Sequence, residues 1–155
     1  MSNFYTTGGA AMSSSRSDWE TPPEVFSRVN AVWHFDLDAA SSDENALCPD
    51  HYTKEQDGLA QSWAGRRVWC NPPYGREVGQ WVAKAHEESK RPGTIIVMLL
   101  PARTDTAWFH DHIAGGKAAE VALLRGRLKF RLGGATQSAA PFPSMLVRWG
   151  GRLYE

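Results

Sequence analysis

The chain lacks the features of a membrane or secreted protein. Its 155 residues contain no apolar run long enough to cross a bilayer and no apolar signal-peptide core. Cysteine is scarce, with only Cys48 and Cys70 present. We therefore expect a cytosolic protein without a membrane partner, whose two thiols stay reduced.

A complete set of metal ligands is also missing. The stretch Cys48-Pro49-Asp50-His51 contains half of a possible zinc site, and Cys70 could be a third ligand. The spacing that a second ligand pair requires is absent. His110 and His112 stand two apart, which places them on different faces of a helix. The sequence therefore predicts no metal site.

An excess of positive charge is absent as well, because 17 basic residues balance 17 acidic ones. This balance disfavours tight DNA binding unless the positive charge gathers on one surface. The length fits one domain, and 42% hydrophobic residues with seven tryptophans are typical of a folded globular protein. Residues 1–17 are rich in Gly, Ser, Thr and Ala, so we expect a flexible N-terminal arm before a single domain at 18–155.

The most informative stretch is a rigid turn, Asn71-Pro72-Pro73-Tyr74. Each proline fixes φ and removes a backbone N–H, so carbonyl acceptors remain. The Asn71 side-chain oxygen and the Pro72 carbonyl could accept both hydrogens of one amino group on a planar base. Tyr74 adds a ring for stacking and a hydroxyl for a partner. Fixed acceptors would aim the nitrogen lone pair at an electrophile and stabilise the developing positive charge, although the bare motif also occurs in ordinary proline-rich turns.

The patterns around this turn predict an α/β fold with a mostly parallel central sheet. The run at 94–100 is continuously apolar, as a central parallel strand covered on both faces would be. With the strand before the turn and the helix after it, this run forms one crossover unit. The last expected strand pairs with its predecessor as a C-terminal antiparallel hairpin. The expected strands cover residues 34–41, 67–70, 94–100, 121–132 and 145–149, with a short extra one near Tyr52 and Thr53.

An unusually complete helix start precedes the first strand. Thr21 is the expected N-cap, Pro22 the first helical residue and Glu24 the partner in a capping box. Such a start is adequate as local structure alone, and its N–H groups could also receive a carboxylate. One face of this helix should be buried, formed by Val25, Phe26, Val29, Val32 and Trp33.

Two groups of charged residues follow the central strand. Arg103 and Asp105 follow the apolar strand and emerge at the edge that carries the rigid turn, where they either contact a ligand or pair with each other. Farther on, four cations alternate with apolar residues along the strand expected at 121–132. They guard an edge strand or supply a phosphate-binding surface. The four are Arg125, Arg127, Lys129 and Arg131.

Six segments occur in a recognisable order. They are Asp18-Trp19-Glu20-Thr21-Pro22-Pro23, Leu37-Asp38-Ala39-Ala40-Ser41, Trp69-Cys70-Asn71-Pro72-Pro73-Tyr74, Leu100-Pro101-Ala102-Arg103-Thr104-Asp105, Arg125-Gly126-Arg127-Leu128-Lys129-Phe130 and Ala140-Pro141-Phe142-Pro143-Ser144. Together these segments, over residues 17–150, resemble the compact phage-type DNA N6-adenine methyltransferases of the Dam family. The resemblance implies a compact Rossmann-like S-adenosylmethionine-dependent methyltransferase fold. It also implies methyl transfer to N6 of a flipped adenine in double-stranded DNA, in the cytoplasm of a bacterial or phage-infected host cell.

The resemblance distributes roles over the chain. The glycine-rich loop that usually lies under the cofactor is replaced here by small residues after Asp38. The Asp57-Gly58 pair stands where, in larger relatives, an acidic turn meets the adenine of the cofactor. Such a pair is also a routine surface turn. The expected catalytic residues are Asn71, Pro72, Pro73 and Tyr74. Those expected at the cofactor are Trp19, Thr21, Pro22, Asp38, Ala39, Ala40 and Asp57. Those expected at DNA are Arg103, Asp105, Arg125, Arg127, Lys129 and Arg131.

Two other functions fit the same residues. The acceptors of the rigid turn also suit a base in RNA or a glutamine amide in a protein. A noncatalytic DNA-binding or cofactor-binding module is the third candidate, because the glycine loop and a large target-recognition domain are missing.

Overall fold

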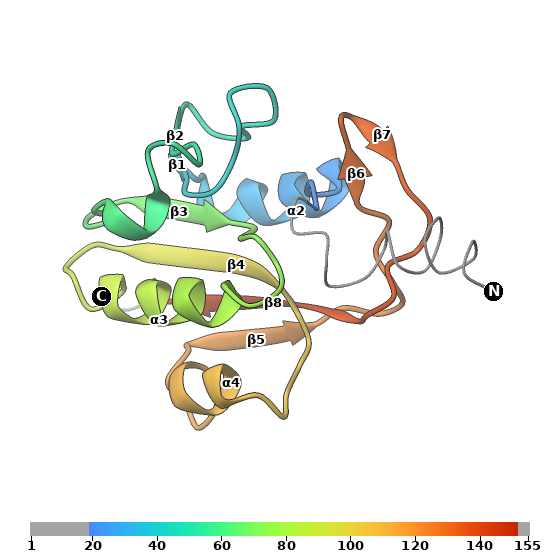
Figure 1. Cartoon of the computed structure of the whole chain (residues 1–155). Coiled ribbons are helices and arrows are strands. Elements are labelled where there is room, and N and C mark those ends of the chain that lie inside the picture. Colours follow the sequence, from blue (N-terminus) through green and yellow to red (C-terminus); the bar gives the residue numbers. More distant parts are fainter. Residues whose placement is uncertain (1–18, 152–155) are drawn as a thin grey trace.

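A computed structural model describes residues 19–151, which are built around a mixed six-stranded sheet with the order β2-β1-β3-β4-β8-β5 (Figure 1). Its strands are β1 (Leu37–Asp38), β2 (Asp50–His51), β3 (Arg67–Cys70), β4 (Ile95–Pro101), β5 (Glu120–Leu123) and β8 (Ser144–Trp149). A separate hairpin consists of β6 (Arg131–Leu132) and β7 (Ala135–Thr136). The predicted arm, residues 1–17, lies outside the described residues.

The sheet is parallel over β2, β1, β3 and β4 and antiparallel where β8 joins β4 and β5. Every residue of β4 is buried, because this strand lies in the middle of the sheet. The prediction of an α/β fold with a mostly parallel sheet is therefore confirmed. The predicted pairing of the last strand with the strand before it also holds for β5, and the extra short strand is β2, directly before Tyr52.

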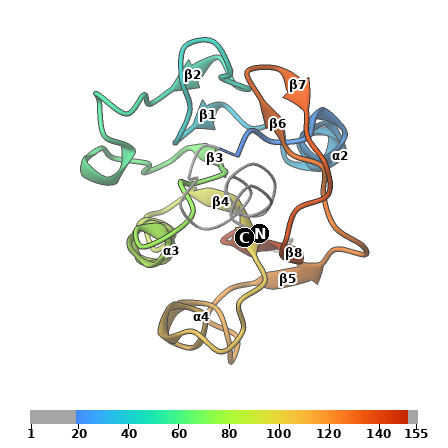
Figure 2. The ribbon, with the colours of Figure 1, turned by 45° about the vertical axis from the view of Figure 1, so that its right-hand side comes forward.

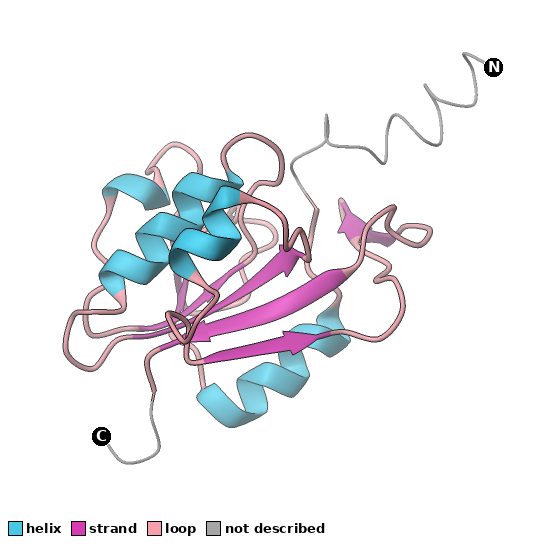
Figure 3. Ribbon diagram, turned by 90° about the horizontal axis from the view of Figure 1, so that it is seen from below, coloured by secondary structure: helices cyan, strands magenta, loops and turns pink. Residues whose placement is uncertain are grey.

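Helices cover both faces of the sheet. Helix α2 (Pro23–Trp33) lies on one face, and α3 (Val78–Glu88) and α4 (Ala107–His112) lie on the other (Figure 3). Phe26 of α2 packs edge-on against Trp69 of β3, with ring centroids 5.3 Å apart. Within residues 19–151, no helix combines the length and the apolar character needed to cross a bilayer.

The start of α2 differs from the prediction. Its N-cap is Pro22 and no side chain caps it, so the expected box of Thr21 and Glu24 does not form. The Thr21 hydroxyl instead accepts a hydrogen bond from a distant residue, Asn71. The buried face was predicted correctly for Phe26, but Val32 is 64% exposed. Val32 borders a groove above β5 and β8, where the described chain places no further helix.

The strand predicted over 121–132 was wrong in its length. β5 ends at Leu123, and β6 begins only at Arg131. Gly126 between them has φ 76°, a left-handed conformation that interrupts an extended strand. The four cations therefore do not lie on the face of one strand. They belong to an excursion of the chain, residues 124–143, that leaves the sheet after β5 and returns at β8.

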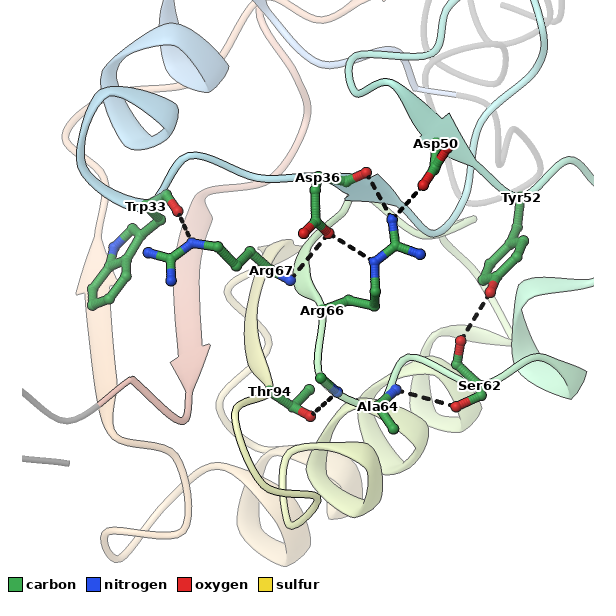
Figure 4. A network of polar contacts seen from close by, with 10 residues as sticks. Trp33, Asp36, Asp50, Tyr52, Ser62, Ala64, Arg66, Arg67 and Thr94 are labelled. Carbon is green, nitrogen blue, oxygen red and sulfur yellow. Dashed lines mark hydrogen bonds and ion pairs between the residues drawn. The ribbon is translucent and has the colours of Figure 1, made fainter.

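The amino ends of three strands are joined by a polar network (Figure 4). The Asp36 carboxylate accepts hydrogen bonds from Arg66 Nε at 3.0 Å and from Arg67 N at 3.2 Å. The same guanidinium donates to Asp50 at 2.6 Å, and Arg67 Nε donates to the Trp33 carbonyl. This network fixes the edge of the sheet opposite to the rigid turn.

Replacement of Asp36 by Ala should lower the free energy of unfolding by about 1–2 kcal/mol, because Arg67 N–H and Arg66 lose an acceptor that is only partly exposed. Urea unfolding measures the difference. Asp43→Ala is the matched control. Asp43 pairs with His51 but is 80% exposed, so about 0.5 kcal/mol or less is expected. Equal effects of the two substitutions would contradict a structural role for the network.

Candidate active site

The rigid turn lies at the carboxyl edge of the parallel strands. β3 ends at Cys70 and runs directly into Asn71-Pro72-Pro73-Tyr74, while β1 ends beside it at Asp38. The neighbouring β4 ends at Pro101 and leads to Arg103 at the same edge. Open α/β sheets bind their ligands in the crevice outside this edge.

The amide of Asn71 is held by its nitrogen. Its Nδ2 donates to the Trp19 carbonyl at 2.6 Å and to Thr21 Oγ1 at 3.1 Å. A carbonyl can only accept, so these contacts assign the nitrogen and leave Oδ1 as the free end of the amide. Within residues 19–151, Asn71 Oδ1 is buried and has no hydrogen-bond partner. Leaving such an acceptor unsatisfied costs about 1–3 kcal/mol in a folded protein.

The two prolines make the turn stiff and poor in donors. Pro72 is buried and Pro73 is half-buried, and neither has a backbone N–H. Among the described residues, no hydrogen bond is made to the Pro72 carbonyl. The turn therefore presents carbonyl and amide acceptors next to each other in the sequence, as the sequence predicts.

The ring of Tyr74, which the sequence suggests for stacking against a base, is buried in the structure. Tyr74 is 3% exposed, and its ring packs edge-on against Phe142 at 5.6 Å and Phe130 at 6.0 Å between centroids. Its hydroxyl donates to the Leu99 carbonyl at 3.0 Å, so the expectation that this group is left for a partner was wrong. Burial raises the pKa of Tyr74 well above its ordinary value, so the phenol stays neutral.

A family model described as "DNA N-6-adenine-methyltransferase (Dam)" matches residues 9–150 of this chain. The chain belongs to this Dam family. It is 41% identical over 108 residues to the DNA N-6-adenine-methyltransferase of Escherichia phage T1, a match that covers 68% of this chain and 44% of that protein. It is 31% identical over 119 residues to the enzyme of the same name from Haemophilus phage HP1 (strain HP1c1), covering 76% of this chain and 68% of the relative. The chain thus spans less than half the length of the T1 relative.

The loop after β1 is organised by Asp38. Its carboxylate accepts from Leu47 N at 3.1 Å and from Ala40 N at 3.3 Å. Burial raises the pKa of Asp38 to about 6, against the lowering effect of these two backbone hydrogen bonds and of His51. Asp38 is thus a loop-ordering acid at 3% exposure rather than an exposed one.

This loop is closely packed, and it contains a buried hydroxyl group without a hydrogen-bond partner among the described residues. The Ser41 hydroxyl is buried and has no hydrogen-bond partner in the described part of the chain. Gly58 packs so tightly beneath Ala39 that a Cβ on it would stand 2.2 Å from the Ala39 carbonyl oxygen. The neighbouring Asp57 is exposed, and its side chain accepts from Leu59 N at 3.2 Å.

Arg103 and Asp105 do not form an ion pair with each other in residues 19–151. Arg103 is half-buried and close enough to Tyr74 for its charge to act on the pKa of that phenol. Asp105 is exposed in the following turn, and Thr106 rather than Asp105 caps α4, with its hydroxyl accepting from Phe109 N at 3.3 Å.

The four cations of the excursion divide into two pairs. The guanidinium of Arg131 donates to the Gly134 carbonyl, and that of Arg127 reaches the Ala140 carbonyl at 3.4 Å. These two therefore stabilise the fold of the excursion itself. Arg125 and Lys129 are exposed and make no hydrogen bond or ion pair within the described residues.

Sequence reasoning missed several residues that enclose the turn. Phe130 and Phe142 surround Tyr74, and Glu20 binds both the hairpin and the loop after β1. These contacts join residues that lie far apart in the sequence, so no local pattern reveals them. Both Phe residues do stand inside segments that resemble the Dam family, which is the one signal that could have identified them.

The cysteines show no ligand arrangement. Cys48 and Cys70 are both free and buried. Burial raises the pKa of Cys48 to about 12, so its sulfur remains a thiol. Residues 19–151 contain no group of three or more His, Cys, Asp and Glu side chains that could hold a metal ion.

The Asp38 carboxyl should titrate with a midpoint near pH 6. Because this folded-state pKa lies above the unfolded value, the contribution of Asp38 to stability is fully present at low pH and is lost as the pH rises through about 6. Carbon-13 NMR of the carboxyl carbons, assigned by comparison with Asp38→Asn, measures the midpoint. A midpoint at or below pH 4 would contradict the burial described here.

Proposed function

We propose that this chain transfers a methyl group from S-adenosylmethionine to N6 of adenine in DNA. The observation that carries the proposal is the buried Oδ1 of Asn71, which has no hydrogen-bond partner among residues 19–151. The amide is oriented by Trp19 and Thr21. A polar atom in this state suits a ligand that brings an N–H donor. Membership of the Dam family supplies the chemical class of that ligand.

The proposed role of the rigid turn follows from its acceptors. Asn71 Oδ1 and the Pro72 carbonyl each receive one hydrogen of the adenine amino group. With both hydrogens held, the nitrogen lone pair points away from the ring toward the incoming methyl group. The same two oxygens stabilise the positive charge that develops on nitrogen during the attack. The new N–C bond would replace the S–C bond of the methyl donor, which leaves as the neutral thioether, and the methylated nitrogen would then lose one proton to solvent. No residue has to remove a proton first, which agrees with a neutral Tyr74.

The methyl donor would lie beside the loop after β1. The residues there fit a polar ligand of that kind, because the Ser41 hydroxyl is buried without a partner in the described part of the chain and the loop packs closely on Gly58. When bound, S-adenosylmethionine supplies an electrophilic methyl group. The residues proposed to hold it are Trp19, Thr21, Pro22, Asp38, Ala39, Ala40, Ser41 and Asp57. Both Pro22 and Pro23 lack an N–H, so the start of α2 offers Glu24 N rather than a full row of donors to a carboxylate.

The adenine must leave the DNA stack to reach this turn, which costs a few kcal/mol. We propose that the base enters beside Tyr74 and that the aromatic group around this residue shifts to admit it. The backbone of the DNA would lie along Arg103, Asp105 and the excursion, with Arg125 and Lys129 as its phosphate contacts and Arg127 and Arg131 as the residues that shape the excursion. The enzyme would work in the cytoplasm of the cell that holds this DNA.

Transfer of tritiated methyl groups tests the proposal, with double-stranded DNA, RNA and total protein offered separately. Label on DNA alone supports it. Label on RNA or protein instead would assign the turn to another planar amine or amide, and cofactor binding without any transfer would indicate a noncatalytic module.

Asn71→Ala should lower kcat for DNA methylation by about 10²–10³-fold, by analogy with the loss of one preorganised oxyanion-hole donor. Urea unfolding checks that the variant still folds. Gln80→Ala is the matched control, because it removes an exposed side-chain amide from α3, outside the turn. A wild-type rate for Asn71→Ala would remove this residue from the catalytic site.

Arg125→Gln and Lys129→Gln should each weaken DNA binding to a similar degree for all sequences and reduce the slope of log K against log salt by about 1. Fluorescence anisotropy over a salt series measures both quantities. Lys90→Gln changes an exposed lysine beyond the end of α3, at the opposite edge of the sheet, and should leave the slope unchanged. Unchanged slopes in both excursion variants would place the phosphates elsewhere.

A further inference from the structure

Glu20 stands where three distant segments of the chain meet. Its backbone pairs with Arg131 of β6 through two hydrogen bonds, from Glu20 N at 2.9 Å and from Arg131 N at 3.0 Å. This pairing places the β6–β7 hairpin beside the start of α2 (Figure 1, Figure 2). The excursion is thereby attached at its far end to the segment that precedes α2.

The side chain of Glu20 extends this connection to a third segment. One oxygen, Oε1, accepts from Gly134 N in the turn of the hairpin at 3.0 Å. The other, Oε2, accepts from Asn45 Nδ2 in the loop after β1 at 3.3 Å. A single carboxylate therefore bridges the tip of the hairpin and this loop.

Asn45 transmits the contact into the loop. Its Oδ1 accepts from Ser42 N at 2.7 Å, and its backbone N donates to Ser42 Oγ at 3.2 Å. Two residues farther on, Leu47 N is bound by the carboxylate of Asp38. The loop that Glu20 contacts is thus internally ordered, and a restraint at Asn45 reaches the residues that follow β1.

The residue before Glu20 touches the rigid turn. The Trp19 carbonyl accepts from Asn71 Nδ2, and the Trp19 ring packs against Phe130 of the excursion at 5.4 Å between centroids. A displacement of the hairpin would therefore move Glu20 and Trp19 together. The loop after β1, the hairpin and the Asn71 amide form one connected unit.

We propose that Glu20 is a positioning residue that couples the two ligand sites, so that DNA held by the excursion restrains the loop after β1 and raises its affinity for the methyl donor. The inference rests on the function proposed above for the excursion and the loop. By thermodynamic reciprocity, the methyl donor raises the affinity for DNA by the same factor. Glu20 touches neither ligand and acts through Gly134 and Asn45.

Calorimetry with S-adenosylhomocysteine, a nonreactive product, tests this role in the full chain. The coupling ratio is its Kd alone divided by its Kd with saturating plasmid DNA. Coupled sites typically give ratios of about 5–150, so we expect a wild-type ratio of at least about 5. Glu20→Ala should bring the ratio close to 1 while the Kd for S-adenosylhomocysteine alone stays near its wild-type value, because Glu20 touches neither ligand.

Two further variants separate the two arms of the carboxylate. Glu20→Gln keeps an oxygen that can accept from Gly134 N, but its amide nitrogen then faces Asn45 Nδ2, and two donors cannot bond to each other. Of the two side-chain contacts of Glu20, Asn45→Ala removes only the hydrogen bond to the loop. Both variants break the arm to the loop and should therefore bring the ratio close to 1, and they keep the test informative if Glu20→Ala does not fold. Glu44→Ala, an exposed acid in the same loop, is the control and should keep the wild-type ratio.

The results distinguish a failure of the coupling role from a failure of the proposed function. A wild-type ratio of 1, or a wild-type ratio retained by Glu20→Ala and Glu20→Gln, would overturn the coupling role. Methyl transfer onto DNA by the wild-type chain is measured in parallel. Transfer with a ratio of 1 contradicts the role of Glu20 only, whereas an absence of transfer contradicts the proposed function.

Discussion

The hydrogen bond from Asn71 Nδ2 to the Trp19 carbonyl is the contact on which the rest of the site depends. An asparagine can present its oxygen to a ligand only if its nitrogen end is held, because the two ends of the amide are otherwise interchangeable by rotation. The Trp19 carbonyl cannot donate, so it permits one orientation only. It also ties the segment before α2 across the carboxyl edge of the sheet, where the rigid turn begins.

The same segment carries the enclosure of the site. Trp19 contacts Phe130 and Phe142, and both of these rings contact Tyr74. Three parts of the chain, before α2, after β3 and between β5 and β8, thus meet in one aromatic group. The ring of Tyr74 is thereby enclosed by side chains from the last of these parts, which Trp19 also contacts. The loop after β1 has no glycine-rich sequence. It is held instead by hydrogen bonds to the carboxylate of Asp38 and by the close approach of Gly58.

The sequence predicted those parts of the molecule that local patterns determine. The continuous apolar run of β4, the crossover through α3 and the place of the rigid turn at a strand end follow from periodicity and proline chemistry. The predicted cap at Thr21 failed because its hydroxyl binds Asn71, fifty residues away in sequence. The strand predicted over 121–132 failed because alternation of charged and apolar residues also fits an excursion whose apolar side chains pack on the core, and Gly126 interrupts it. The contacts of Glu20 could not be predicted from the sequence, because its two partners come together only in the folded chain.

The Asn71 oxygen that we propose to receive the amino group of adenine can be tested through the position of the transferred methyl group. DNA incubated with the purified chain and S-adenosylmethionine carrying a deuterated methyl group can be digested to nucleosides and analysed by mass spectrometry. We expect the label in N6-methyldeoxyadenosine, and its loss with Asn71→Ala. Label in a methylated cytosine, or label in deoxyadenosine at a carbon or ring-nitrogen position, would contradict it.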